Sequence, residues 1–178
     1  MTSERVPVLV VTGPVGVGKT TIAGDISALL ADAGIPHACV DVDALRDTWP
    51  APPGDRFNTE LGLRNLAAIW RNFRTAGAER VILADVVERR SDLDGYRTAI
   101  PGAEVTLVRL RASVAILQAR VGQREAGAGR EWHLLRAAEL ATQMDRDALE
   151  DILIETDGRP PESIAREILV RTRWLPEA

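Results

Sequence analysis

The sequence has a single cysteine and a single lysine among 178 residues. One cysteine, Cys39, can form no disulfide within the chain, so a fold held together by disulfides is excluded. No apolar run approaches the roughly 20 residues of a membrane-spanning helix. The net charge of -4 gives no general attraction to nucleic acid or anionic lipid, and the four tryptophans do not alternate with basic residues. We therefore expect a cytoplasmic protein, monomeric or homodimeric, that binds neither nucleic acid nor membranes.

What is present fits one globular domain over residues 1–178, with no linker or repeat inside it. Apolar runs alternate with amphipathic segments, which predicts an α/β fold with a parallel sheet. Strands are expected at 6–12, 37–41, 80–85, 104–110 and 152–155. Helices are expected at 20–33, 59–76, 113–124, 132–149 and 162–173, and the stretch from about 114 to 149 as a mobile helical lid. In helix 132–149 the inward residues are expected to be Leu134, Leu135, Ala138, Ala141 and Met144.

The most informative segment is 13–20, GPVGVGKT, which matches G-x-x-x-x-G-K-[ST] between a predicted strand and a predicted helix. Glycine accepts backbone angles that let such a loop turn several N–H groups towards a phosphate chain, and the helix start adds partial positive charge. Lys19 supplies a mobile cation, and the Thr20 hydroxyl is an oxygen ligand suited to Mg²⁺. The only lysine of the chain stands at the motif position, which disfavours a glycine-rich turn without a ligand. We expect a nucleoside triphosphate site formed by Gly13, Gly16, Val17, Gly18, Lys19, Thr20 and Thr21.

Carboxylates follow two of the predicted strands. Asp41 and Asp43 are two residues apart, so they point to the same side at the carboxyl end of their strand, where open parallel sheets bind ligands. One could hold Mg²⁺ through water while the other orients or deprotonates an attacking hydroxyl; alternatively, Asp43 caps a helix. Asp85 follows four apolar strand residues and is expected on the metal side, although a loop acid gives the same pattern.

These features, with Arg120-x-x-x-Arg124, resemble the P-loop kinases of small molecules. That group includes nucleoside monophosphate, shikimate, gluconate and adenylylsulfate kinases, chloramphenicol phosphotransferase and zeta-toxin-like kinases. The resemblance implies a three-layer P-loop NTPase fold with a five-stranded parallel sheet in the order 2-3-1-4-5 and a helical lid. It also implies that ATP and Mg²⁺ are the cofactors.

The resemblance also implies roles for individual residues. Lys19 and Arg124 would act on the transferred phosphate, and Asp43 would contact the acceptor hydroxyl. The metal side would consist of Thr20, Asp41 and Asp85. Arg120 would pack on adenine, and Asp157 follows the last strand, where similar kinases often enclose the adenine. Independently of the resemblance, arginines four apart share a helix face and suit phosphate oxygens, although a solvated basic face has the same spacing.

The acceptor side departs from two patterns of this group: the stretch after Asp85 reads VVERR rather than the adenylate kinase pattern, and the glycine-rich pattern of shikimate kinases is absent from the sequence. Candidates for this side are Asp43, Arg46, Trp49, Asn58, Arg64, Glu88, Arg89 and Arg90. We expect an ATP-dependent phosphotransferase that moves the γ-phosphate to a hydroxyl of a small metabolite or natural product. The alternative is an ATP-hydrolysing regulatory switch without an acceptor. A standard GTPase is disfavoured because its N/T-K-x-D sequence needs a second lysine.

Overall fold

Five parallel strands form the centre of the protein. The structure is a computed structural model that describes residues 5–55, 57–124 and 129–175, without the side chains of 124, 129 and 130. The strands are β1 (Val6–Thr12), β2 (Ala38–Asp41), β3 (Val81–Ala84), β4 (Ala103–Arg111) and β5 (Ile152–Glu155). Their spatial order is β2-β3-β1-β4-β5, and every neighbouring pair is parallel. This confirms the predicted sheet.

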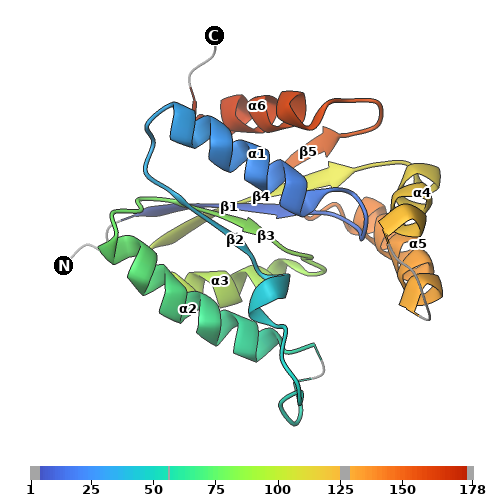
Figure 1. The fold of residues 1–178 in the computed structure, drawn as a ribbon, viewed down its shortest axis with the longest axis horizontal. Helices are drawn as coiled ribbons and strands as arrows, with labels where there is room; N and C mark the ends of the chain where they lie inside the picture. Colours follow the sequence, from blue (N-terminus) through green and yellow to red (C-terminus); the bar gives the residue numbers. More distant parts are fainter. Residues whose placement is uncertain (1–4, 56, 125–128, 176–178) are drawn as a thin grey trace.

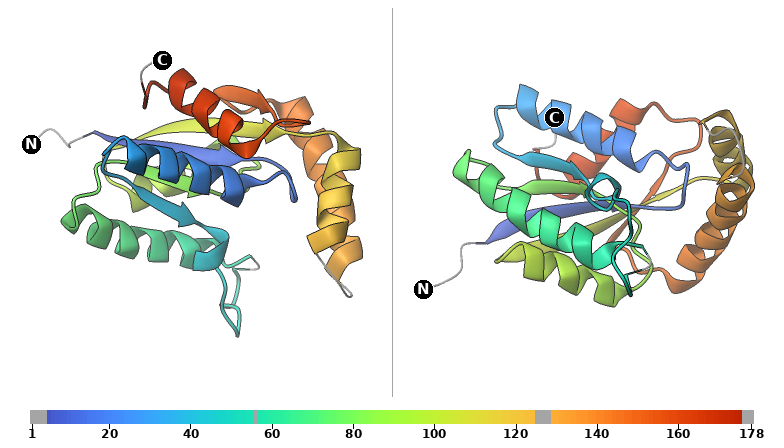
Figure 2. Two further views of the ribbon diagram at one scale, coloured as in Figure 1. Left: turned by 45° about the horizontal axis from the view of Figure 1, so that its top comes forward. Right: turned by 60° about the horizontal axis from the view of Figure 1, so that its bottom comes forward.

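Helices cover both faces of the sheet and one of its ends (Figure 1). One face carries α1 (Lys19–Asp32) and α6 (Pro161–Arg171), and the other carries α2 (Thr59–Thr75) and α3 (Leu93–Ala99). At the carboxyl ends of the strands stand α4 (Val114–Arg124) and α5 (Gly129–Asp147), and Figure 2 shows both of them projecting away from the sheet. Two short 3-10 turns, η1 (Asp43–Leu45) and η2 (Arg90–Asp92), follow β2 and β3. Among the residues described, no helix is long and apolar enough to span a bilayer.

The core lies in two apolar layers, one on each face of the sheet. Successive residues of a strand point to opposite faces. Leu9 of β1 therefore packs in the layer beneath α1 and α6, while Val10 packs beneath α2 and α3. Because both faces are covered, β3 is buried at every position. This explains why the central strands appear in the sequence as continuous apolar runs.

The buried face of α5 differs from the predicted one. Met144 is buried as expected, but Leu135 is 63% exposed, and Ala137 and Leu140, which were not expected to face inward, are buried. The sequence offers two overlapping apolar stripes on this helix, and α5, which packs against α4, buries the stripe through Ala137, Leu140 and Met144. The expectation that Leu135 faces inward was therefore wrong.

The carboxyl end of α5 is tied to the sheet by a buried arginine. Arg109 of β4 is 4% exposed, and its guanidinium contacts Asp145 of α5 at 2.7 Å and Glu150 at 3.0 Å. A buried charge needs such partners, because desolvating it without them is costly. The ion pair with Asp145 therefore fixes the end of the helix to the strand beneath it, and the pair with Glu150 fixes the segment that follows the helix.

Candidate functional site

The loop between β1 and α1 has the backbone angles that the glycine pattern predicts. Gly13, Gly16 and Gly18 have φ values of 147°, 84° and 102°. A Cβ atom at Gly13 would lie 2.6 Å from the carbonyl oxygen of Leu110, and one at Gly16 would lie 2.8 Å from Cγ2 of Val121. Glycine is therefore required at both positions by conformation and by space.

Lys19 and Arg120 both bond to this loop. The Lys19 Nζ donates to the carbonyl oxygens of Gly13 at 3.1 Å and Pro14 at 3.4 Å. Arg120 of α4 donates from Nη1 to the carbonyl oxygen of Val17 at 3.1 Å. Two cations thus lie against the loop whose backbone the motif assigns to phosphate, and α4 is attached to it directly.

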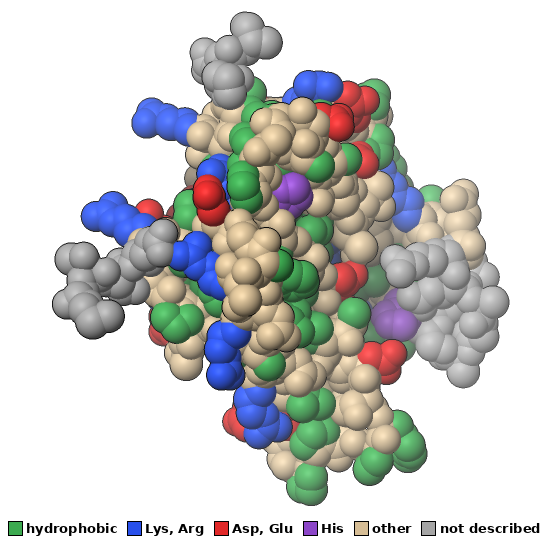
Figure 3. Space-filling model, turned by 60° about the vertical axis from the view of Figure 1, so that its left-hand side comes forward, with side chains coloured by type: hydrophobic (Ala, Val, Ile, Leu, Met, Phe, Trp, Pro, Cys, Tyr) green, Lys and Arg blue, Asp and Glu red, His purple; other side chains and the backbone are tan. Residues whose placement is uncertain are grey.

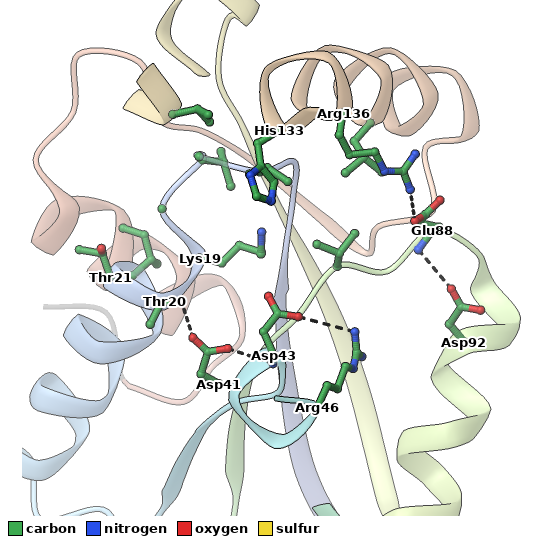
Figure 4. A pocket seen from close by; sticks show the side chains of 18 of the residues that line it. Lys19, Thr20, Thr21, Asp41, Asp43, Arg46, Glu88, Asp92, His133 and Arg136 are labelled. Carbon is green, nitrogen blue, oxygen red and sulfur yellow. Dashed lines mark hydrogen bonds and ion pairs between the residues drawn. The ribbon is translucent and has the colours of Figure 1, made fainter. Parts of the chain in front are cut away.

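Thr20, Asp41 and Asp43 form a chain of polar contacts at the start of α1. Thr20 Oγ1 donates to Asp41 Oδ2 at 2.8 Å, and the Asp43 backbone N–H donates to Asp41 Oδ1 at 3.1 Å. The helix-cap alternative requires Asp43 at the N-cap of η1, but Val42 occupies that position, and the Asp43 carboxylate lies 3.6 Å from Arg46 Nη1. Its side chain remains mostly exposed and points into the same space as Lys19 and His133 (Figure 4).

Asp85 is enclosed by partners rather than open to a metal. Its side chain is fully buried, Arg46 Nη2 lies 2.6 Å from Oδ2, and the Tyr96 hydroxyl donates to Oδ2 at 2.5 Å. The Val86 N–H donates to Oδ1 at 2.8 Å. Burial raises the pKa of Asp85 to about 6, although Arg46 and Tyr96 lower it. The metal-side assignment of Asp85 is therefore revised: its carboxylate holds Arg46.

A cavity of about 1350 Å³ opens above these residues. It extends from the phosphate loop to α5 and to the segment after β3, and it exceeds the roughly 300–1,000 Å³ of a site for one small ligand. Two reactants can therefore lie in it side by side. Of the residues proposed from the sequence, those that line it are Gly16, Val17, Gly18, Lys19, Thr20, Thr21, Asp41, Asp43, Arg46, Glu88, Arg89 and Arg120.

Several expected residues do not line this cavity. Trp49 is 92% exposed in the loop after η1, and Arg64 lies on an exposed part of α2. Asp157 accepts the backbone N–H of Ser113 at 3.0 Å, so its carboxylate supports the start of α4. Arg124 ends α4, but its side chain lies outside the described structure. We exclude Trp49, Arg64 and Asp157 from the proposed ligand contacts.

Sequence reasoning missed the wall opposite the phosphate loop. This wall includes His133 and Arg136 of α5, and Arg136 forms an ion pair with Glu88 after β3 (Figure 4). Phe57, Tyr96 and Trp132 also line the cavity. No motif marks these residues, because the packing of separate segments, α5 among them, brings them to the site. The only available signal was compositional, since Tyr96 is the one tyrosine of the chain.

Solved structures resemble this chain over nearly its whole length, although no family model and no curated protein matches it. A gluconokinase from Sinorhizobium meliloti is 22% identical with a TM-score of 0.59, covering 98% of both chains. A Mycobacterium tuberculosis APS kinase in complex with AMPPNP and APS is 20% identical with a TM-score of 0.62, covering 95% of this chain and 98% of that one.

The chain has the fold of the small-molecule P-loop kinases. A tunicamycin resistance protein from Deinococcus radiodurans also resembles it, at 19% identity and a TM-score of 0.63, covering 94% of this chain and 96% of that one. The similarity confirms the expected fold family. In this chain the sheet order makes β1 the central strand, so the phosphate loop that follows it lies at the centre of the carboxyl edge.

Proposed function

We propose that the protein is an ATP-dependent phosphotransferase that moves the γ-phosphate of ATP to a hydroxyl of a small molecule. The observation that carries this proposal is that the phosphate loop and the exposed carboxylate of Asp43 open into one cavity with room for two reactants. A nucleotide-hydrolysing switch needs the loop but has no use for the second half of the cavity.

The nucleotide half supplies positive charge and N–H donors. The N–H groups of the loop and the amino end of α1 favour phosphate oxygens, and Lys19 adds a cation. Mg²⁺ fits beside them, because the Thr20 hydroxyl and the Asp41 carboxylate lie 2.8 Å apart on the cavity wall and both are hard oxygen ligands. Bound Mg²⁺ would neutralise phosphate charge.

The acceptor half provides a base with a fixed position. Asp43 takes the proton of the acceptor hydroxyl as the new oxygen–phosphorus bond forms and the bond from the γ-phosphorus to ADP breaks. Arg46, held by buried Asp85, lies 3.6 Å from Asp43 and orients its carboxylate. Lys19 and Arg124 neutralise charge on the moving phosphoryl group, and Arg120 flanks the nucleotide. Most of the rate enhancement would come from positioning and charge stabilisation.

Loss of the only lysine tests this function. ATP consumption with Mg²⁺ is measured with and without a panel of hydroxylated metabolites and antibiotics, and phosphorylated products are identified by mass spectrometry. Lys19→Ala should abolish transfer and leave the fold intact, because it removes a loop cation and no core contact. Arg166→Ala is the matched control, since it removes an exposed cation from α6, far along the chain from the loop. Full turnover by Lys19→Ala would refute the phosphate-loop assignment, and hydrolysis that no compound changes would favour the switch.

A further inference from the structure

The arginines on the acceptor side of the cavity each face a carboxylate. Arg136 forms an ion pair with Glu88, and Arg89 lies 3.5 Å from Asp92. Arg46 lies 2.6 Å from Asp85. An anionic acceptor would meet the charge of these carboxylates: the Arg46 pair is buried and costly to open, and at the more exposed Arg89 and Arg136 a second anion would lie beside the carboxylate already bound. The carboxylates beside these arginines therefore favour a neutral acceptor over an anionic one.

The same half presents large apolar surface. Phe57 precedes α2 and is 61% exposed, while Trp132 lies in the first turns of α5 and is 54% exposed; both line the cavity. The chain has only four Trp, two Phe and one Tyr, and Phe57, Tyr96 and Trp132 are all at this cavity. Figure 1 shows that the segment before α2 and helix α5 both extend beyond the sheet. Covering an exposed aromatic ring with an apolar part of a ligand removes both surfaces from water, which contributes favourably to the free energy of binding.

Helix geometry assigns Trp132 to the acceptor side. Residues four apart on a helix share a face, so Trp132 lies one turn from Arg136 on the same side of α5. Arg136 contacts Glu88 on the segment that follows β3. On the face shown in Figure 3, acidic side chains and a histidine lie close together at the right, and hydrophobic side chains gather at the lower edge.

We infer that the acceptor is an uncharged, hydroxylated small molecule that carries an aromatic or similarly flat apolar group. Its apolar group contacts Trp132 and Phe57, and one hydroxyl reaches Asp43. The inference rests on the proposed phosphotransfer at the same site. The transfer step is the one proposed above: the acceptor hydroxyl forms a bond to the γ-phosphorus, its proton passes to Asp43, and ADP leaves.

Matched acceptors separate charge from apolar contact. Phenyl β-D-glucoside is neutral and aromatic, phenyl β-D-glucuronide is anionic and aromatic, and methyl β-D-glucoside is neutral without a ring. Uridine and uridine monophosphate form a second pair, and chloramphenicol, gluconate and shikimate extend the panel. Initial rates with Mg²⁺ and ATP give KM and kcat for each compound. We expect kcat/KM for a neutral aromatic compound to exceed that for its charged or ring-free counterpart by at least about tenfold.

The possible outcomes distinguish this inference from the proposed function. Transfer that prefers glucuronide, uridine monophosphate, gluconate or shikimate overturns the acceptor class but leaves the phosphotransferase standing. Equal use of phenyl and methyl glucosides also overturns it. If no neutral aromatic compound is phosphorylated, the acceptor class is refuted. In that case, ATP binding by the wild-type protein that is lost in Lys19→Ala would still support the assignment of the nucleotide site. Hydrolysis unmoved by the whole panel refutes the proposed function itself.

Three variants test the residues named. Trp132→Ala and Phe57→Ala should each raise KM for the neutral aromatic acceptor by about tenfold and leave kcat nearly unchanged, because they remove contact area and no reacting group. Leu135→Ala is the control: it removes an equally exposed apolar side chain from α5 outside the cavity lining. Glu88→Gln should shift preference towards the anionic counterpart, since Arg136 loses its main partner. An equal rise in KM with Leu135→Ala, or no shift with Glu88→Gln, contradicts the inference.

Discussion

The buried pair of Arg46 and Asp85 yields the sharpest prediction about this protein. Arg46→Met keeps most of the side-chain volume but removes the guanidinium that lies 2.6 Å from a fully buried carboxylate. The Tyr96 hydroxyl and the Val86 N–H would still donate to Asp85, but the cation that contacts it would be gone. The variant therefore leaves a charge in the core without its counter-ion.

The expected loss of stability is large because only one partner is removed. Breaking a buried ion pair in this way typically costs about 3–5 kcal/mol. Adding Asp85→Asn removes the stranded charge, so the double variant should recover most of that loss. Its amide can exchange hydrogen bonds with the Tyr96 hydroxyl, which can donate or accept. We expect the double variant to be more stable than Arg46→Met alone.

The loss should also depend on pH with a definite sign. Burial raises the pKa of Asp85 from 3.8 to about 6, so the folded protein binds this proton more tightly than the unfolded chain does. The stability that Asp85 contributes is therefore complete below pH 3.8 and is lost as the pH rises through about 6. Arg46 lowers this pKa, so Arg46→Met raises it further and extends the loss to higher pH.

Urea unfolding followed by tryptophan fluorescence measures both effects. The difference in unfolding free energy between wild type and Arg46→Met should be small at pH 5 and several kcal/mol, about 3 or more, at pH 8. Comparing each variant with wild type at the same pH removes the titration of other groups. An equal difference at pH 5 and pH 8, or a double variant no more stable than Arg46→Met, would refute a charged, ion-paired Asp85.

Three further predictions concern the nucleotide and acceptor sides. Asp43→Asn should lower kcat, measured by turnover, by about 10²-fold or more, because it removes a base. ATP affinity, measured by calorimetry, should change little; a fall in affinity as large as the fall in kcat would place Asp43 with the metal. Asp41→Asn should raise the Mg²⁺ concentration needed for half-maximal turnover, and an unchanged Mg²⁺ titration contradicts its placement. Gly16→Ala should weaken ATP binding at least about tenfold, because its Cβ meets Val121 at 2.8 Å. Gly24→Ala, in open space on α1, should bind ATP normally and gain roughly 0.5–1 kcal/mol of stability.

The fold could be predicted from the sequence because its signals are local. Each observed strand begins and ends within one residue of its predicted bounds, since apolar runs and bounding glycines or acids mark both ends. The phosphate loop is likewise one contiguous segment whose glycines have the positive φ values that the motif requires. These features depend on neighbours in the chain, so a single sequence carries them.

The acceptor wall could not be predicted, because it depends on contacts between distant segments. The sequence identified Asp85 as an acid at the end of a strand. Its partners are Arg46 and Tyr96, which precede and follow it in the sequence and meet it only in the folded protein. The side chains of α5 reach the cavity only after packing has chosen between two apolar stripes. Trp49 lies among prolines where no periodicity indicates an inside or an outside.

Because Arg109 holds the carboxyl end of α5, a tilt of this helix moves its amino end the most. Asp145, at the anchor, and Trp132 are thirteen residues apart on one helix, and at about 1.5 Å per residue this is an arm of about 20 Å. If α5 tilts about its anchored end, the displacement of each residue grows with its distance from that end. A tilt of about 10° therefore moves Trp132 by about 3 Å. The ring that meets the acceptor would thus travel farthest while the ion pairs at the sheet stay closed.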